Sequence, residues 1–307
     1  MKAARIHRFG PPDVIEVEDI PRPDPGPGEV LVRIAAAGVG PWDALIREGR
    51  SKVSPPPPLT LGSDLSGVVE AVGTGVIRFK NGDEVYGVTN PQFVGANADF
   101  AVASAHMVAP KPQRLSTLEA ASAPVVAVTA WQMLFEYARP EAGQRVMILG
   151  AAGNVGAYAV QFAANAGYHV IAVVGSNDVE YVRTLGAKDV IDYRVTDFVR
   201  TVRSVDGVID TVGGDTRDRA FAVLKPGGIL VTVVSTAFVP ARADVRSVFF
   251  YAEVTTARLS AISELLERGK VIPQVGSVVP LEQVRMAHEM LAGAPHRRGK
   301  ILLEVAA

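Results

Sequence analysis

The sequence predicts an α/β protein with a β-rich N-terminal region and a central parallel sheet covered by helices on both faces. Two observations predict this division. Short apolar runs separated by proline and glycine clusters fill the first hundred residues, whereas apolar strands alternate with helical stretches from about residue 117 onward. A chain of 307 residues is also long enough to form two hydrophobic cores.

The N-terminal region has the pattern of β-structure. Residues 28–34 partly alternate apolar with polar side chains, and residues 66–73 form an apolar run that ends in glycine. Residues 55–58 are four consecutive prolines. Because proline lacks a backbone donor, these four predict a rigid surface loop, which could also wall a cleft.

The central region predicts a repeated strand-helix order. Residues 118–137 look helical, and a second helix that ends at residue 166 follows a glycine-rich turn. The expected strands are residues 145–149, 169–174, 189–191, 207–212 and 228–234, and the helices between them are residues 179–185, 196–202 and 216–224. Strands that are apolar throughout indicate a parallel sheet buried on both faces. The C-terminal part adds helices at 257–268 and 281–291 and strands at 275–279 and 301–305.

Composition excludes several classes of function. The formal net charge is -1 and no run of five like charges occurs, so neither nucleic acid nor an anionic membrane surface is an expected partner. The chain has no cysteine, which excludes disulfides, thiolate zinc sites and cysteine nucleophiles. No apolar stretch of about 18 residues and no signal-peptide pattern occurs, and we therefore expect a cytoplasmic protein.

A glycine-rich turn lies between the apolar strand at 145–149 and the following helix. Its residues are Gly150, Ala151, Ala152, Gly153, Asn154, Val155 and Gly156. Small residues here let the backbone approach a pyrophosphate, and the helix N-terminus offers free N–H groups and a positive dipole. The turn therefore predicts dinucleotide binding, and the alternative is a tight turn without a ligand.

The end of the second central strand bears on the choice between NADPH and NADH. Sites that bind NAD carry a carboxylate there, whereas this strand runs into Ser176, which leaves room for a 2′-phosphate. We therefore expect NADPH, with NADH as the alternative. Asp178 could serve a ribose or could simply begin a helix. Tyr193 and Arg194, after the third strand, could contact the phosphate or could simply be exposed.

A different enzyme class competes at this point. Residues 207–210 and 224–230 also resemble the later strands of S-adenosylmethionine methyltransferases. The second strand lacks the terminal acidic residue that would hold the ribose of that ligand, and the β-rich first hundred residues would be unexplained.

Several ordered blocks are similar to the medium-chain dehydrogenase/reductase superfamily, in its zinc-free quinone oxidoreductase (zeta-crystallin-like) branch. The blocks are residues 27–32, 37–43, 61–69, 79–87, 128–131, 150–156, 185–187 and 296–301. Each block is modest alone, but their order and spacing cover nearly the whole chain.

The resemblance implies a GroES-like β-rich domain and a Rossmann nucleotide-binding domain. The GroES-like substrate and catalytic domain would comprise residues 1–117 and 257–307, and the NAD(P)-binding domain residues 118–256. It also implies a homodimer and hydride transfer from NADPH to a quinone or an α,β-unsaturated carbonyl. Because some relatives are NADPH-binding structural proteins, non-catalytic binding is the alternative.

The resemblance also bears on zinc. Zinc-dependent relatives have Cys where this chain has Gly40 and a His-Glu pair where it has Ser63 and Asp64. The five histidines, at positions 7, 106, 169, 288 and 296, fall in no ligand spacing. We therefore expect a zinc-independent enzyme. Without a Lewis acid, a conjugated acceptor is favoured, because its reduction gives a delocalised anion.

By resemblance, most of the remaining candidate site residues belong to the cofactor. Thr129 is expected near the nicotinamide or pyrophosphate, and Gly153, Asn154 and Val155 are expected to present backbone donors to the pyrophosphate. The other candidates are Val212 and Val234 at strand ends, Phe249 and Phe250 beside the nicotinamide, and Lys300. The alternatives are a threonine inside a helix, an aromatic core patch at 249–251, and a solvated lysine.

The substrate side is expected at Gly40, Pro41, Trp42 and Asp43, which would form the pocket floor. Trp42 could stack on a planar substrate, and Asp43 could have a structural role or transfer a proton. The branch commonly has Asn at position 40, and quinone-active relatives often carry tyrosines where this chain has Leu45 and Ser51. These departures favour a general enone reductase over a quinone-specific one, and no general acid is assigned.

Overall fold

The chain folds into two units, each with its own sheet and core. The structure is a computed structural model that describes residues 1–234 and 242–305. Unit 1 comprises Met1–Val125 and Val254–Ala307, and unit 2 comprises Val126–Glu253. The two ends of the chain therefore build one unit, and the middle of the chain builds the other.

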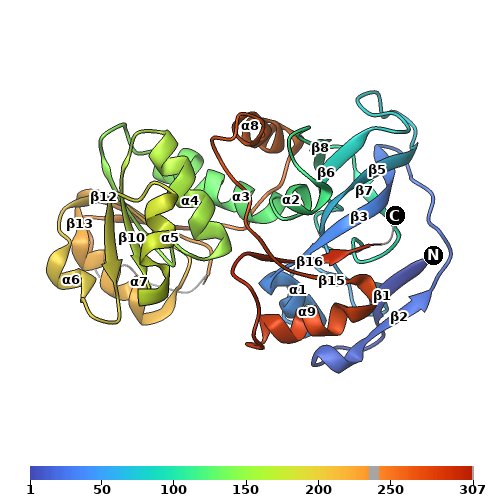
Figure 1. Cartoon of the computed structure of the whole chain (residues 1–307), viewed down its shortest axis with the longest axis horizontal. Helices are drawn as coiled ribbons and strands as arrows, with labels where there is room; N and C mark the ends of the chain where they lie inside the picture. Colours follow the sequence, from blue (N-terminus) through green and yellow to red (C-terminus); the bar gives the residue numbers. More distant parts are fainter. Residues whose placement is uncertain (235–241, 306–307) are drawn as a thin grey trace. The chain divides into compact units, whose positions relative to one another are not determined.

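Unit 1 contains the β-rich part of the chain (Figure 1). Its larger sheet has the strand order β15-β16-β3-β5-β6-β8, and β7 also pairs with β3. These strands are β3 (Glu29–Val39), β5 (Asp64–Val72), β6 (Glu84–Val88), β7 (Phe100–Ser104), β8 (Val108–Pro110), β15 (Val275–Pro280) and β16 (Lys300–Glu304). A second sheet pairs β1 (Lys2–Ile6) with β2 (Ile15–Asp19) and β4 (Leu59–Thr60). The helices are α1 (Pro41–Arg47), α2 (Thr117–Ala121), α8 (Thr256–Glu267) and α9 (Val284–Leu291).

The core of unit 1 joins the two ends of the chain. Val30, Val32 and Ile34 alternate along β3 and are buried with side chains from β5, β6 and β16. The C-terminal strand β16 lies antiparallel to β3, so that Ile301 is opposite Val39. The last strand is therefore part of the first unit.

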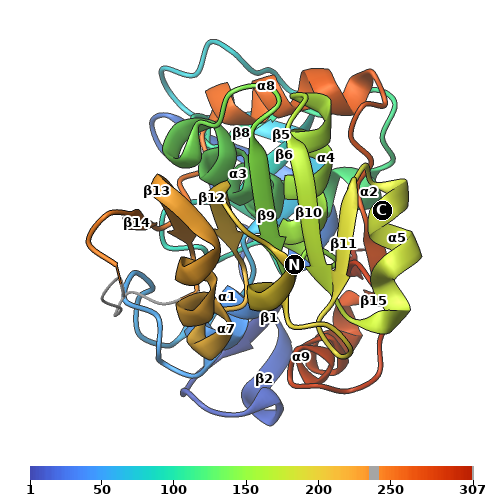
Figure 2. The same cartoon turned by 90° about the vertical axis from the view of Figure 1, so that its left-hand side faces the viewer.

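Unit 2 contains a six-stranded parallel sheet with the order β11-β10-β9-β12-β13-β14. Figure 2 shows β11, β10, β9, β12 and β13 side by side in this order. The strands are β9 (Arg145–Leu149), β10 (His169–Val174), β11 (Asp189–Asp192), β12 (Val205–Asp210), β13 (Leu224–Thr232) and β14 (Arg246–Phe249). This order, in which the first strand lies centrally and the chain moves outward in both directions, is that of dinucleotide-binding domains.

Helices cover both faces of this sheet. Phe198 of α6 (Phe198–Thr201) and Ala220 of α7 (Gly214–Ala220) pack with Met147 and Leu149 of β9 on one face. Helix α4 (Asn154–Asn165) packs on β9 and β10, and helix α5 (Val179–Thr184) packs on β11. The expected fold class, a GroES-like β-rich domain with a Rossmann doubly wound sheet, is confirmed.

Two of the expected helices differ most clearly from those in the structure. The helix expected at 118–137 is divided into α2, α3 (Pro124–Trp131) and a π-helical segment, Gln132–Ala138. Pro124 begins α3 because a proline fits only the first turn, where no N–H bond is needed. The helix expected at 216–224 gives way after Ala220, and β13 begins at Leu224, where it pairs with Val205.

Helix α2 also bears on the expected domain boundary at residue 117. It packs on β3 and β5 and so lies in unit 1, whereas the expected boundary assigns it to the nucleotide-binding domain.

The prolines at 55–58 lie in a loop before β4, and three of the four are exposed. Within the described residues, no helix combines the length and apolar character needed to cross a bilayer.

Candidate functional site

The glycine turn follows β9 in unit 2 and requires glycine at two positions. Gly150 has a φ of +70°, a conformation that side chains disfavour. A Cβ on Gly156 would lie 2.2 Å from the carbonyl oxygen of Gly150, so the first turn of α4 can pack on the strand end only without a side chain there. The local sequence thus brings the N-terminus of α4 against the end of β9.

The N-terminus of α4 has the features of an anion site. Gly153 is the N-cap residue, and because glycine has no side chain it makes no side-chain capping hydrogen bond to the first N–H groups of the helix. Gly153 is exposed, and Asn154 and Val155 are partly exposed, so these donors are accessible. The free N–H groups and the helix dipole fit the pyrophosphate of a dinucleotide.

The ends of β10 and β11 bring a second set of polar groups together. A Cβ on Gly175 would lie 3.4 Å from the Tyr193 hydroxyl and 3.5 Å from Arg194 Nε, so both side chains flank the end of β10. Ser176 donates a hydrogen bond to Asp192, and this bond holds the pKa of that carboxyl below its usual range. The Arg194 N–H also donates to Asp192 at 2.9 Å. Ser176 and Tyr193, which were both expected to contact the cofactor, therefore lie close together.

The other expected cofactor residues of unit 2 differ in their exposure. Val212 and Val234 are 46% and 47% exposed and follow the carboxyl ends of the adjacent strands β12 and β13. Thr129 is nearly buried in α3, and Phe249 is half-buried. The Phe250 ring is buried and stacks on Tyr137 with centroids 4.4 Å apart, which favours the core-patch alternative for that residue.

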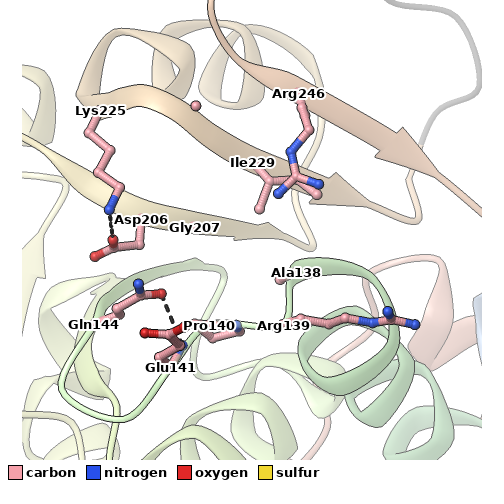
Figure 3. Close-up of a pocket in the computed structure, with 11 residues that line it drawn as sticks. Ala138, Arg139, Pro140, Glu141, Gln144, Asp206, Gly207, Lys225, Ile229 and Arg246 are labelled. Atoms are coloured by element: carbon pink, nitrogen blue, oxygen red, sulfur yellow. Dashed lines mark hydrogen bonds and ion pairs between the residues drawn. The ribbon is translucent and has the colours of Figure 1, made fainter.

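A cavity at the opposite end of the same sheet is separate from these groups. It has a volume of about 230 Å³ and lies beside the amino ends of the strands, where Lys225 pairs with Asp206 (Figure 3). Ligands of open parallel sheets bind outside the carboxyl ends of the strands, so this cavity is not the candidate dinucleotide site.

In unit 1, the expected pocket-floor residues form the start of α1. Gly40 is the N-cap, and its N–H donates to Asp43 Oδ2 at 2.7 Å. The Trp42 Nε1–H donates to Ser63 Oγ at 3.0 Å. A Cβ on Gly40 would lie 2.4 Å from Trp42 Cη2, so the indole occupies the space that a side chain at position 40 would take. The absence of Asn at position 40 thus has a steric reason.

Lys300 and Asp64 form a buried ion pair beside this ring. Lys300 Nζ lies 2.8 Å from Asp64 Oδ2 and 3.9 Å from the centroid of the Trp42 ring. The Lys300 side chain is 1% exposed and that of Asp64 is 0% exposed, so the alternative of a solvated lysine is wrong. A Cβ on Gly38 would lie 2.8 Å from both Lys300 Cε and Asp64 Cβ, which makes glycine necessary beneath the pair. The contact of Lys300 with a cofactor stays a prediction.

Asp43 is fully buried in the same cluster. Burial raises the pKa of Asp43 to about 7, although the Lys300 ammonium acts in the opposite direction. Asp64 is occupied by Lys300 and by the Val125 N–H, which donates to Asp64 Oδ1 at 3.0 Å. The hydrogen bond from Gly40 gives Asp43 the structural role that was one of its two expected roles.

Sequence reasoning missed several residues of this cluster. Gly38 had no assigned role, and Ser63 and Asp64 were considered only as replaced zinc ligands. A weak signal was available, because Asp64 is a carboxylate next to Leu65 and shortly before the apolar run Val68–Val69. Its partner could not be identified from the sequence, since Lys300 lies at the other end of the chain.

Comparisons with known proteins identify the family. Residues 26–113 match the family model described as alcohol dehydrogenase GroES-like domain, and residues 185–303 match the one described as zinc-binding dehydrogenase. A quinone oxidoreductase of Sus scrofa is 30% identical over 322 residues, which cover 99% of this chain and 97% of the relative. The chain belongs to the quinone oxidoreductase branch of the medium-chain dehydrogenase/reductase superfamily.

Two further members of this superfamily bear on the cofactor. A mitochondrial NAD(P)H oxidoreductase of Bos taurus is 33% identical over 326 residues, which cover 91% of this chain and 82% of the relative. The solved quinone oxidoreductase of Escherichia coli in complex with NADPH has a TM-score of 0.86 and 26% identity, with 99% of this chain and 100% of that chain covered. The protein is thus an oxidoreductase of a family that uses nicotinamide cofactors, and the methyltransferase interpretation is wrong.

The zinc in the description of one family model does not fit the residues present here. Gly40 and Ser63, at two of the superfamily's zinc-ligand positions, offer no zinc-binding imidazole or thiolate, and Asp64 is bound to Lys300. Within the described residues, ligand atoms of His7, Glu16 and Glu18 lie within 4.8 Å of one another, which the spacing of the histidines did not predict. Glu18 of that group is paired with Arg5 at 2.9 Å. No step of the chemistry is therefore assigned to zinc.

Proposed function

We propose that the protein is a zinc-independent, NADPH-dependent reductase that transfers a hydride to a quinone or an α,β-unsaturated carbonyl compound. The observation that carries the proposal is the Gly150–Gly156 turn, whose packing excludes a side chain at position 156 and leaves the N-terminus of α4 uncapped. Relatives named as quinone oxidoreductases over nearly the whole chain support the acceptor class.

The preference for NADPH rests on the ends of β10 and β11. A hydroxyl, Ser176, stands where NAD-specific sites place a carboxylate. The Arg194 guanidinium and the Tyr193 hydroxyl flank the adjacent Gly175, so a donor and a positive charge are available to a 2′-phosphate. Asp192 already accepts hydrogen bonds from Ser176 and from the Arg194 backbone.

The residues of the chain bind and orient the reactants. The N–H groups of Asn154 and Val155 hold the pyrophosphate, and Val212 and Val234 present an apolar edge at the carboxyl ends of the strands. When bound, the nicotinamide supplies the hydride. A conjugated acceptor needs little further stabilisation, because the enolate or hydroquinone anion that it forms is delocalised and takes a proton from water.

The partly exposed Trp42 offers an aromatic surface for a flat acceptor in unit 1. The buried Lys300–Asp64 pair and the Ser63 hydroxyl fix its ring. We therefore include Gly40, Pro41, Trp42 and Asp43 in the proposal as the substrate side, with a small quinone or enone as the partner and with a homodimer as the expected assembly.

A titration tests the proposal. The purified protein is titrated with NADPH and with NADH while nicotinamide fluorescence is followed, and each titration is repeated with an enone and with a quinone present. We expect tighter binding of NADPH and its oxidation only when an acceptor is added. An Arg194→Leu variant should lose affinity for NADPH and keep that for NADH, because only NADPH carries the 2′-phosphate.

Three results would separate the alternatives. Binding of NADPH without turnover of any acceptor would favour the non-catalytic binding protein. Equal affinities for NADPH and NADH, unchanged in Arg194→Leu, would contradict the role of the β10 and β11 ends. No binding of either nucleotide would refute the proposed function as a whole.

A further inference from the structure

Three turns interlock at the carboxyl edge of the unit 2 sheet. A Cβ on Gly150, after β9, would lie 2.5 Å from Thr211 Oγ1, after β12. Thr211 Oγ1 also donates to the carbonyl of Leu149 at 2.8 Å. A Cβ on Gly213 would lie 2.8 Å from Val234 Cγ1, after β13. Glycines at the points of contact thus let the β12 turn touch both the glycine turn and the β13 turn.

One buried carboxylate and one buried hydroxyl hold two of these turns. Asp210 Oδ1 accepts hydrogen bonds from the N–H groups of Val212 at 3.0 Å and Gly213 at 2.9 Å. Asp210 Oδ2 accepts from Thr232 Oγ1 at 2.7 Å. The same Thr232 oxygen accepts from the Val234 N–H at 3.2 Å. The backbone amides of both exposed valines are therefore fixed through a single pair of side chains.

Neither member of this pair can reach a ligand. Asp210 and Thr232 are both 0% exposed, whereas Val212 and Val234, which they hold, are about half exposed. A buried carboxylate is costly unless hydrogen bonds satisfy it, and here each of its oxygens has a partner. The hydrogen bonds of this buried pair therefore serve to hold the two exposed valines in place.

We propose that Asp210 and Thr232 are positioning residues for the nicotinamide cofactor. They fix Val212 and Val234 as one apolar ledge beside the glycine turn, so that the dinucleotide meets a surface that is already ordered. This inference rests on the proposed function, because the ledge has this role only if a nucleotide binds at the carboxyl edge.

The test removes the hydroxyl while keeping the shape of the side chain. Thr232→Val should raise the Kd for NADPH by up to about tenfold, since it breaks one hydrogen bond to a carboxylate and one from a backbone amide. Thr232→Ser keeps the hydroxyl and should restore most of the affinity. Thr89→Val is the matched control, because Thr89 is also 0% exposed and donates to the Val94 carbonyl at 2.8 Å in unit 1.

Two readouts separate positioning from general destabilisation. The NADPH Kd is measured by nicotinamide fluorescence. Amide hydrogen exchange is measured without any nucleotide for Val234, whose N–H donates to Thr232 Oγ1, and for Val212 and Gly213, whose N–H groups donate to Asp210. We expect Thr232→Val to weaken binding and to speed exchange at these amides, and Thr89→Val to change neither.

The outcomes that overturn the inference differ from those that overturn the proposed function. If the wild type binds NADPH and Thr232→Val binds it within twofold of the wild type, Asp210 and Thr232 do not position the cofactor. If Thr89→Val weakens binding as much as Thr232→Val, the effect is one of overall stability and the inference is wrong. A wild type that binds no nucleotide refutes the proposed function instead.

Discussion

Asp43 gives unit 1 a stability that depends on pH in a specific direction. The side chain is fully buried, and burial raises its pKa from the ordinary value of 3.8 to about 7. The folded state therefore keeps a proton that the unfolded state releases as the pH rises above about 4. The stabilisation by this proton is complete below about pH 4 and is lost as the pH rises through 7.

The size of the effect follows from the shift. Each pH unit between the two pKa values changes the free energy of unfolding by about 1.4 kcal/mol, which gives about 4 kcal/mol over the whole range. Asp43→Asn removes this dependence while its amide oxygen still accepts the hydrogen bond from Gly40. Relative to this variant, the wild type should lose about 2 kcal/mol between pH 5 and pH 7, and little more above pH 8.

Tryptophan emission makes this measurable for unit 1 alone. The chain has two tryptophans, and a Trp131→Phe background leaves Trp42, at the start of the same helix as Asp43, as the reporter. Urea unfolding at pH 5, 6, 7 and 8 then gives the free energy of unfolding for each protein. Asp83→Asn is the matched control, because Asp83 Oδ2 accepts from the N–H three residues earlier, as Asp43 does, but near the surface.

The reasoning makes a definite claim that this experiment can refute. We expect the difference between wild type and Asp43→Asn to change with pH and the difference between wild type and Asp83→Asn to stay flat. A flat difference for Asp43→Asn as well would mean that the attraction of Lys300 outweighs burial. The carboxyl would then be ionised throughout, and the cluster would hold two carboxylates against one ammonium.

Three further predictions concern other close contacts. Gly156→Ala should weaken NADPH binding about tenfold or more in the fluorescence titration, because its Cβ would lie 2.2 Å from a backbone oxygen. Gly207→Ala is the control and should bind like the wild type, because its Cβ would have no neighbour closer than 3.9 Å. Gly40→Ala should shift the Trp42 emission and cost about 1–3 kcal/mol in urea unfolding, since the added methyl displaces the indole; an unchanged spectrum would contradict this packing. His288 is buried against Arg47, and its burial, together with the smaller effect of the Arg47 charge, lowers its pKa to about 3. As the pH falls from 6.5 to 5, the free energy of unfolding of the wild type should therefore fall by about 2 kcal/mol relative to that of His288→Asn. Equal dependence of the two proteins on pH would refute this.

The packing of Trp42 against Gly40 bears on the choice of substrate. The indole of Trp42 fills the space that a side chain at position 40 would take, so the start of α1 presents an aromatic ring. An aromatic ring favours flat, apolar acceptors and offers fewer hydrogen bonds to a carbonyl. Under the proposed function, the rates at which different acceptors are reduced should therefore depend more on the planarity of the acceptor than on its number of polar groups.

The parallel sheet and the place of the glycine turn could be predicted from the sequence alone. Both depend on local patterns, because apolar strands, helix periodicity and glycine spacing are encoded in consecutive residues. The approximate positions of the central strands followed from the same patterns. The break at Pro124 and the early start of β13 did not, since they depend on neighbouring elements with which these segments pair.

The contacts between residues far apart in the sequence became visible in the tertiary structure. Lys300 meets Asp64 because β16 and β5 are both neighbours of β3, with Gly38 between them, and no local pattern records that pairing. Asp210 meets Thr232 because β12 and β13 are adjacent and in parallel register. Local sequence sets which elements form, whereas the partners of buried polar groups are set by strand order, which brings residues together regardless of their separation along the chain.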